Sequence, residues 1–402
     1  MDERAWLDAM RRILDRSHLW KPDQVAETVA ATMERLGITT TIYLVDHEQH
    51  ALQPLPVPGR ETPDPAQIDD SLAGRAFALV RSVPDGSGRA ARSHWWVPVV
   101  NGTDRIGVLD FLLPEGLDPQ AEALRERCEL LAGLVGHLIS TCRPRGDSLE
   151  LVRRSQPMSV ASELLWQVLQ PLTASSDELV ITAVLEPCYA VGGDGYDYAV
   201  DGMSAQFAIL DGVGRGLSAG LATVVALASI RAARRDGGDL VAQARSADAA
   251  LFAEFTDARF VTGFLAELNL ETGLLRYVNA GHPAPVLLRG KSAVAEVGGG
   301  GRMPLGIADL RTEMGEQQLE PGDRLLLYTD GITEARDAGG EQFGLDRLVK
   351  LAEHHDAAGL PAPETLRRLS HAVVEHQHGL PEDDATLLLA EWSPGSARRT
   401  VP

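Results

Sequence analysis

Apolar and polar positions along the first 145 residues follow helical and strand periods in turn. A Pro- and Gly-rich loop at residues 54–65 and an Asn101-Gly102 turn separate some of the elements. The pattern predicts helices over residues 5–36, 71–80 and 122–139, and strands over residues 38–45, 95–100 and 105–111. This order predicts an α+β module over residues 1–145.

A second set of elements begins near residue 177, where strands cluster and pairs of helices intervene. Strands are predicted over residues 180–185, 204–210, 262–269, 274–278, 285–288, 324–328 and 385–392. Helices are predicted over residues 216–234, 240–255, 345–355 and 362–375. Clustered strands favour two sheets with helices outside over alternating βαβ units, so the fold class is again α+β.

Residues 146–172 are predicted to be a helical linker between the two parts. Arg143-Pro144-Arg145-Gly146-Asp147 interrupts the pattern, and a wide apolar stripe then follows over residues 160–170. Such a stripe is expected to pack against the following sheet or against a second subunit, and both alternatives stay open. The predicted domains are residues 1–145, the linker, residues 173–393, and a polar tail over residues 394–402 that is expected to be disordered.

Composition narrows the possible partners. The 402 residues suffice for two domains, and the net charge of -20 argues against nucleic acid and anionic membranes as partners. The three cysteines, Cys128, Cys142 and Cys188, have the spacing of neither a zinc site nor a disulfide framework. Residues 216–230 fall short of the roughly 20 apolar residues of a membrane span. No signal peptide is visible, and we expect a cytoplasmic protein.

Four acidic motifs in the second part carry the chemistry. They are Gly193-Asp194-Gly195-Tyr196-Asp197, Asp211-Gly212-Val213-Gly214-Arg215-Gly216, Thr329-Asp330-Gly331-Ile332-Thr333-Glu334 and Glu382-Asp383-Asp384-Ala385-Thr386. Three of the four motifs lie at the end of an apolar, strand-like run or just before one, so the fold could bring their carboxylates together. Converging carboxylates repel unless a cation holds them, and oxygen-only ligands favour Mg²⁺ or Mn²⁺ over zinc.

Two simpler interpretations compete with a metal site. The glycines after Asp211 could form a phosphate-binding loop at a helix start, although their spacing fits neither known nucleotide fingerprint. A single acid at a strand end is usually a turn cap. Because four such motifs occur together, the metal site is the better hypothesis.

The second part resembles the metal-dependent, type 2C-like serine/threonine protein phosphatases of the bacterial branch typified by SpoIIE and RsbU. Besides the four acidic motifs, the resemblance includes residues 169–171, Phe260-Val261-Thr262, residues 277–283 and Pro304-Leu305-Gly306-Ile307. It covers roughly residues 166–392 in order.

This resemblance implies an αββα sandwich with two Mn²⁺ or Mg²⁺ ions between its sheets. It implies that Asp211 bridges both ions, that the Gly212 carbonyl is a ligand, and that Asp194 contacts the second ion or its waters. It also implies that Asp330 and Asp383 hold one ion, with Asp383 preferred over Asp384 as the ligand. The ions would activate a water that hydrolyses phosphoserine or phosphothreonine on a protein, by resemblance a phosphorylated STAS-type anti-anti-sigma factor.

Some residues depart from the family pattern or invite another role. Gly195 replaces a bulky residue and could loosen the loop that holds Asp194, whereas Arg215 replaces a frequent His and is either a surface residue or a phosphate contact. Asn279 and Gly281 are expected to shape a turn, which makes a catalytic His282 the weaker alternative. Tyr196, Asp197 and Glu334 are expected to lie behind the ligands.

The first part resembles a GAF domain in residues 71–76, 96–99 and 106–109. The resemblance implies a sensor for a small molecule or a protein, and a packing or dimerisation module is the alternative. We expect residues 157–171 to couple this domain to Asp211 in a homodimer. The rival functions are a non-catalytic phosphoprotein-binding regulator of sigma-factor partner switching and a two-metal nucleotide phosphodiesterase.

Overall fold

The structure is a computed structural model, and it divides the chain into two compact units. It describes residues 3–85, 93–114, 117, 121–186, 189–190, 192–257, 259–307, 309, 311–378, 383–395 and 400–401. The N-terminal unit comprises Met1–Gln156 and Arg398–Pro402, and the C-terminal unit comprises Pro157–Ala397. Cys188 and Glu382, singled out above, lie outside the described residues. In the predicted disordered tail, Thr400 is buried within the N-terminal unit, a tertiary contact that polar composition cannot reveal.

An antiparallel six-stranded sheet with the order β3-β2-β1-β6-β5-β4 forms the centre of the N-terminal unit. Its strands are β1 (Thr39–Val45), β2 (Ala51–Pro54), β3 (Ala66–Gln67), β4 (Val83–Pro84), β5 (Ser93–Asn101) and β6 (Asp104–Leu113). The helices are α1 (Glu3–Ser17), α2 (Val25–Glu34), α3 (Leu72–Leu79), α4 (Glu122–Cys142) and α5 (Ser148–Arg153), with short 3₁₀ turns at Pro22–Gln24 and Arg143–Arg145.

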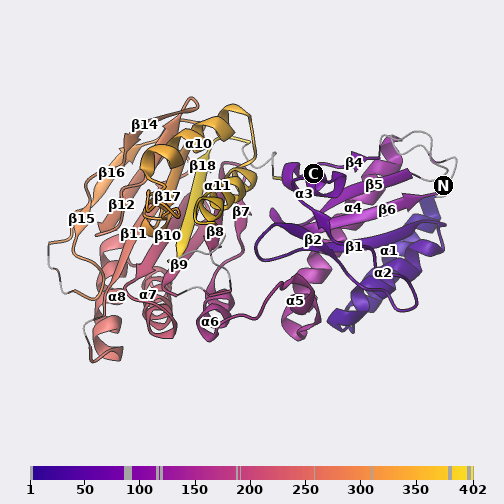
Figure 1. Ribbon diagram of the computed structural model, residues 1–402, viewed down its shortest axis with the longest axis horizontal. Coiled ribbons are helices and arrows are strands. Elements are labelled where there is room, and N and C mark those ends of the chain that lie inside the picture. The colour runs from indigo at the N-terminus through magenta and orange to yellow at the C-terminus, as the bar shows by residue number, and fades with distance from the viewer. Residues whose placement is uncertain are drawn as a thin grey trace. The chain divides into compact units, whose positions relative to one another are not determined.

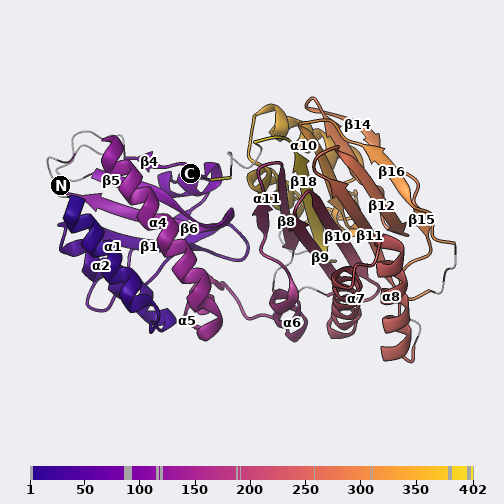
Figure 2. The same ribbon diagram turned by 180° about the vertical axis from the view of Figure 1, so that it is seen from behind.

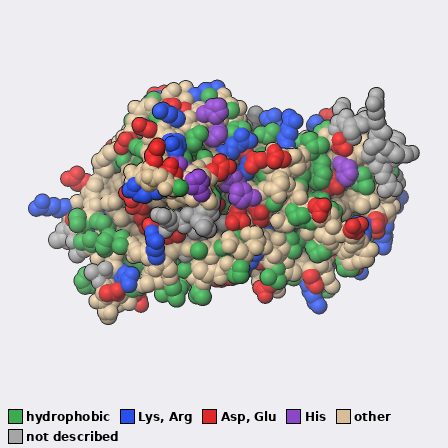
Figure 3. All heavy atoms as spheres, in the orientation of Figure 1, with side chains coloured by type: hydrophobic (Ala, Val, Ile, Leu, Met, Phe, Trp, Pro, Cys, Tyr) green, Lys and Arg blue, Asp and Glu red, His purple; other side chains and the backbone are tan. Residues whose placement is uncertain are grey.

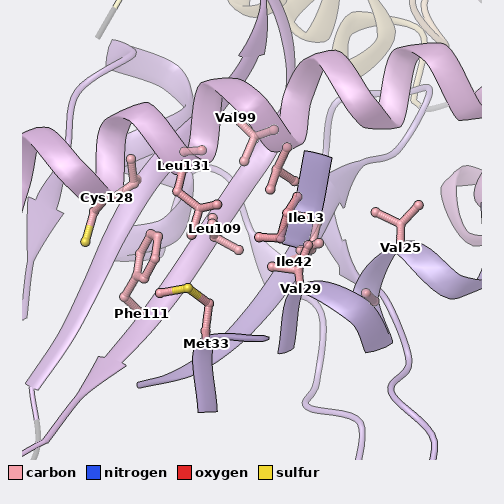
Figure 4. Packing of buried hydrophobic residues seen from close by; sticks show 14 of the residues in the cluster. Ile13, Val25, Val29, Met33, Ile42, Val99, Leu109, Phe111, Cys128 and Leu131 are labelled. Carbon is pink, nitrogen blue, oxygen red and sulfur yellow. The ribbon is translucent and has the colours of Figure 1, made fainter. Parts of the chain in front are cut away.

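Helices cover both faces of this sheet. On one face, α1, α2 and α4 bury a continuous apolar core that includes Ile13, Met33, Phe111 and Leu131 (Figure 4). On the other face, α3 packs over a smaller cluster. The helix predicted over residues 5–36 is in fact two helices, because Pro22 begins a 3₁₀ turn between them.

Two further six-stranded sheets form the C-terminal unit. The first sheet has the order β15-β12-β11-β10-β9, with β16 also paired to β12, and the second has the order β14-β13-β17-β18-β8-β7. The first contains β9 (Asp194–Asp201), β10 (Ser204–Gly212), β11 (Val261–Asn269), β12 (Leu274–Ala280), β15 (Gly301–Arg302) and β16 (Gly315–Gln318). The second contains β7 (Thr173–Ser175), β8 (Leu179–Glu186), β13 (Val286–Arg289), β14 (Ser292–Glu296), β17 (Asp323–Tyr328) and β18 (Ala385–Trp392).

The two sheets face each other across one apolar core, and helices cover their outer faces (Figures 1 and 2). Helices α7 (Leu217–Arg235) and α8 (Leu240–Glu254) pack on the first sheet. Helices α10 (Leu345–Ala357) and α11 (Ala362–His376) pack on the second. A short helix, α9 (Asp330–Thr333), follows β17. The predicted α+β class and the helix–sheet–sheet–helix layering are therefore confirmed.

Helix α6 (Val160–Val168) connects the linker to the sandwich. A Cβ built on Gly220 of α7 would lie 3.6 Å from a Leu165 methyl and 3.7 Å from the Ala161 Cβ, so the two helices cross closely at this glycine. Leu165 is fully buried, whereas Val160 is largely exposed. Part of the predicted stripe is therefore core packing against α7.

One helix among the described residues, α7, is long and apolar enough to cross a membrane by length and composition alone. Its 19 residues are more than the apolar stretch over residues 216–230 that was compared above with a membrane span. Because α7 packs on the first sheet, it also has the features of a core helix in a sandwich.

Candidate metal and phosphatase site

Asp194 and Asp211 lie opposite each other on neighbouring antiparallel strands. The β9–β10 register pairs Asp211 with Asp194 and, two residues along, Ile209 with Tyr196. Because side chains alternate between the faces of a strand, all four point to the same face of the sheet. Ile209 and Tyr196 belong to the core between the sheets, so both carboxylates face the interior of the sandwich at its edge.

The second sheet brings Asp330, Asp383 and Asp384 to the same edge. Asp330 follows the end of β17, and the other two precede the start of β18, its antiparallel neighbour. Thr329 connects the two sheets: its hydroxyl donates to Asp194 Oδ2 at 2.7 Å and accepts from the Thr386 N–H at 2.9 Å. Each of the four sequence motifs thereby contributes at least one acid to this edge of the sandwich: Asp194, Asp211, Asp330, Asp383 and Asp384.

Asp384 is buried and holds the loop before β9. Its carboxylate accepts hydrogen bonds from the Gly192 N–H, at 2.8 Å to each oxygen, and from the Gly193 N–H at 2.5 Å. Asp383 is half exposed and forms an ion pair with Arg215 at 3.3 Å. The two adjacent acids therefore have different environments, one engaged by the backbone and one open to the loop after β10.

The Gly212 carbonyl, a predicted ligand, lies against Gly193. The Gly212 N–H donates to the Gly193 carbonyl at 3.0 Å, and a Cβ on Gly193 would stand only 2.3 Å from the Gly212 oxygen. A side chain at position 193 would therefore obstruct this carbonyl. The glycine keeps the two loops in close contact.

Burial and the repulsion of neighbouring carboxylates raise the pKa values of four carboxyl groups at this edge: Asp194, Asp211, Asp330 and Asp384. Burial, followed by the charges of Asp330, Asp383 and Asp384, raises the pKa of Asp211 to about 7. The pKa of Asp194 is raised well above its usual range by burial and then by Asp211 and Asp384. Burial is also the main cause of the raised pKa values of Asp330 and Asp384. A bound cation would offset this repulsion and favour the ionised forms of the carboxyl groups.

The donor set fits a hard divalent cation, because it offers carboxylate oxygens and one backbone carbonyl. Among the described residues, no three His, Cys, Asp or Glu side chains already have the spacing of a formed metal site.

Gly195 does not loosen the loop before β9, contrary to expectation. It lies within β9, and a Cβ there would stand 2.8 Å from Thr223 Cγ2 and 3.3 Å from a Leu227 methyl of α7. The glycine allows α7 to pack closely on the strand that carries Asp194.

The residues expected behind the ligands have separate structural roles. The Tyr196 hydroxyl donates to the Gln170 carbonyl at 2.6 Å. Asp197 faces α7, where it pairs with Arg231 at 2.7 Å and Arg234 at 2.8 Å. Glu334 is exposed and contributes to the raised pKa of Asp330. None of the three is placed as a ligand.

The turn at residues 279–282 has the structural role that the sequence predicts. The Asn279 side chain accepts from the His282 N–H at 2.8 Å and donates to the His282 carbonyl at 2.9 Å, while Gly281 has a φ of +69°. Burial lowers the pKa of His282 to about 3, so the imidazole is neutral at physiological pH. His282 Nδ1 lies 3.0 Å from the Thr262 hydroxyl, a contact within the first sheet.

Two contributors were not predicted from the sequence. Thr329 belonged to a recognised motif, but the residue that it contacts, Asp194, lies 135 positions away. The residues around Thr329 in the sequence therefore give no indication of this contact. Arg259 is the other: a Cβ on Gly214 would lie 3.7 Å from its Nη1. A basic residue directly before Phe260-Val261-Thr262 was the only available indication.

Residues 201–393 match the SpoIIE family, described as stage II sporulation protein E. These residues, which lie in the C-terminal unit, form a SpoIIE-family serine/threonine phosphatase domain. Phosphatases of this family are metal-dependent, usually with Mn²⁺ or Mg²⁺.

Two curated relatives of this SpoIIE-family domain come from Bacillus subtilis. Phosphoserine phosphatase RsbU is 25% identical over 234 residues, which cover 58% of this chain and 69% of RsbU. Phosphoserine phosphatase RsbP is 27% identical over 192 residues, which cover 46% of this chain and 45% of RsbP. A crystal structure of RsbU and RsbW domains from Mycobacterium tuberculosis has 24% identity and a TM-score of 0.49, covering 54% of this chain and 62% of that one.

Proposed function

We propose that this chain is a metal-dependent protein phosphatase that hydrolyses phosphoserine or phosphothreonine on a regulatory protein. The observation that carries the proposal is the convergence of Asp194, Asp211, Asp330 and Asp383 at one edge of the sandwich. Asp211, Asp330 and Asp383 lie within the residues that match the SpoIIE family, and the relatives' names support the same activity.

In this proposal, two Mn²⁺ or Mg²⁺ ions are held by Asp194, Asp211, the Gly212 carbonyl, Asp330 and Asp383. When bound, such ions lower the pKa of a water and neutralise phosphate charge. Asp384 does not hold an ion in this proposal, because its oxygens already accept hydrogen bonds from backbone N–H groups. We therefore assign Asp384 to positioning the loop that leads to Asp194.

Side chains around the ligands prepare the carboxylates for this task. The Thr329 hydroxyl donates to Asp194 Oδ2, which restrains the orientation of this carboxylate. In the metal-free protein, the raised pKa of Asp211 leaves part of its population protonated near neutral pH. Metal binding must release these protons, which makes loading favourable at higher pH.

The names of the relatives support a proposal on the substrate. RsbU and RsbP are named phosphoserine phosphatases. We propose a phosphorylated STAS-type protein as the substrate, and control by the N-terminal unit. A GAF identity for that unit, its ligand, the homodimer and the cytoplasmic location stay predictions from the sequence.

The alternative hypothesis, a non-catalytic regulator that binds a phosphoprotein, rested on Gly195 as an unusual residue near Asp194. Because Gly195 accommodates α7 and leaves the carboxylates in place, it gives no reason to expect an inactive site.

The deciding experiment measures phosphate release from a phosphoserine peptide during a Mn²⁺ titration of the full chain. We expect metal-dependent release by the wild type and its loss in Asp211→Asn. Asp201→Asn, an exposed acid at the far end of β9, is the matched control and should behave as wild type. Activity that persists in Asp211→Asn would refute the site. A wild type that neither binds Mn²⁺ nor releases phosphate would support the binding role instead.

A further inference from the structure

Two arginines border the loop between β10 and α7. Arg215 lies in this loop, and its Nη2 approaches Asp383 Oδ2 at 3.3 Å, with both side chains more than half exposed. Arg259 precedes β11, the neighbour of β10, and its Nη1 faces Gly214 of the same loop. Its Nη2 pairs with Asp257 at 2.8 Å. Both guanidinium groups therefore border the loop that follows Asp211, and Arg215 also contacts Asp383.

The Arg215 ion pair uses a carboxylate that the proposed metal site also needs. Two cations on one carboxylate repel each other, so a metal ion at Asp383 competes with the Arg215 guanidinium. An exposed ion pair contributes only about 0.2–1 kcal/mol, which a divalent cation held by several carboxylates readily exceeds. Metal binding would therefore displace Arg215 from Asp383 and leave its guanidinium without this partner.

The balance of charge between the carboxylates, the metal ions and an incoming phosphate suggests a role for the displaced guanidinium. Asp194, Asp211, Asp330, Asp383 and Asp384 together carry more negative charge than two divalent cations can neutralise. A phosphate dianion that enters the site needs further positive charge. Guanidinium groups supply it in a planar geometry that matches two phosphate oxygens.

Resting on the proposed function, we propose that Arg215 occupies Asp383 until metal binds and then, together with Arg259, binds the substrate's phosphate group. Arg215 thus changes partner from Asp383 to phosphate when metal binds, whereas Arg259 is not released by metal binding. Because Asp257 is not among the carboxylates that surround the metal position, loss of Arg259 should leave metal binding unchanged. Arg259→Gln is therefore the matched control for Arg215→Gln in metal titrations.

The test uses the full chain, stripped with EDTA, at physiological ionic strength so that distant charges are screened. Calorimetric Mn²⁺ titration should show binding tightened about two- to five-fold in Arg215→Gln, the equivalent of losing one exposed ion pair. Arg259→Gln should match the wild type. Arg215→Lys, which keeps the charge, should bind Mn²⁺ close to the wild-type affinity.

Kinetics on a phosphoserine peptide at saturating Mn²⁺ test the contact with phosphate. Both glutamine variants should raise KM about ten-fold, the loss expected for a charge-assisted hydrogen bond, with a smaller change in kcat. Arg215→Lys should recover only part of this loss, because an ammonium cannot form the planar two-oxygen contact.

The outcomes separate this inference from the proposed function. Equal Mn²⁺ affinity in Arg215→Gln and wild type would overturn the displacement, and unchanged KM in both glutamine variants would overturn phosphate binding. If the wild type released no phosphate, the proposed function would fail while the Mn²⁺ titration still decided the displacement. Binding of inorganic phosphate to the Mn²⁺-loaded variants, which needs no turnover, would then decide the role in phosphate recognition.

Discussion

At the scale of single residues, Thr329 shows how one hydroxyl can serve both sheets. It is fully buried, donates to Asp194 of the first sheet and accepts from the Thr386 N–H of the second. Groups that orient a metal ligand in this way influence affinity although they never touch the ion. Thr329 is therefore a positioning residue.

Replacing Thr329 by Val should weaken Mn²⁺ binding about ten-fold or more, because Asp194 loses its donor while the residue volume is retained. Thr329→Ser keeps the hydroxyl and should stay close to wild type. Calorimetric Mn²⁺ titration of the full chain measures both variants. Wild-type affinity in Thr329→Val would show that Asp194 needs no such support.

The adjacent acids Asp383 and Asp384 illustrate what a motif can and cannot predict. Their position before an apolar strand indicates a site in which at least one of them takes part. The difference between them depends on Gly192 and Gly193, which lie about 190 positions away. Because local sequence contains no information on such contacts, only the tertiary structure distinguishes them.

At the scale of elements, β9 separates the side chains of one motif onto two faces. Asp194 and Tyr196 face the interior of the sandwich, whereas Gly195 and Asp197 face α7. This strand was not predicted, because Gly and Asp are unfavourable in strands and obscure its alternation. Pairing with β10 outweighs that local preference.

The close contact of α7 with β9 predicts a specific cost for a side chain at position 195. Gly195→Ala should lower the free energy of unfolding by about 1–3 kcal/mol, since its methyl group would overlap Thr223 and Leu227. Gly298→Ala, where a Cβ meets nothing within 4 Å, is the matched control and should be nearly neutral. Urea unfolding measures both, and equal midpoints would contradict the packing argument.

At the scale of the whole molecule, acidic side chains outnumber basic ones, and the net charge is -20. Acidic and basic side chains are nevertheless intermixed on the face shown in Figure 3. Asp194 and Asp211 differ from such surface charges, because burial and the repulsion of neighbouring carboxylates raise their pKa values. Their protonation should therefore influence global stability.

The metal-free protein should lose stability as the pH rises from about 5 to 8. In this range the folded state binds more protons than the unfolded state, because the pKa of Asp211 is about 7 when folded and near its ordinary value of 3.8 when unfolded. Its raised pKa contributes stability only while the carboxyl is protonated. Saturating Mn²⁺ should remove this dependence by replacing the protons.

Thermal unfolding in EDTA across this pH range measures the effect, with Asp211→Asn as the control that should flatten the curve. A melting temperature that stays constant in EDTA would contradict the raised pKa values. A dependence equal in wild type and Asp211→Asn would assign it to other groups.

The sequence by itself determined the α+β class, most of the long helices and central strands, and the acidic motifs that form the site. These features depend on local periodicity and on residue chemistry, which the sequence contains directly. Only the tertiary structure decided the pairing of Asp194 with Asp211, the contacts of Thr329 and Asp384, and the place of Gly195 under α7. These depend on contacts between residues far apart in the chain, which arise when the two sheets pack and β9 pairs with β10.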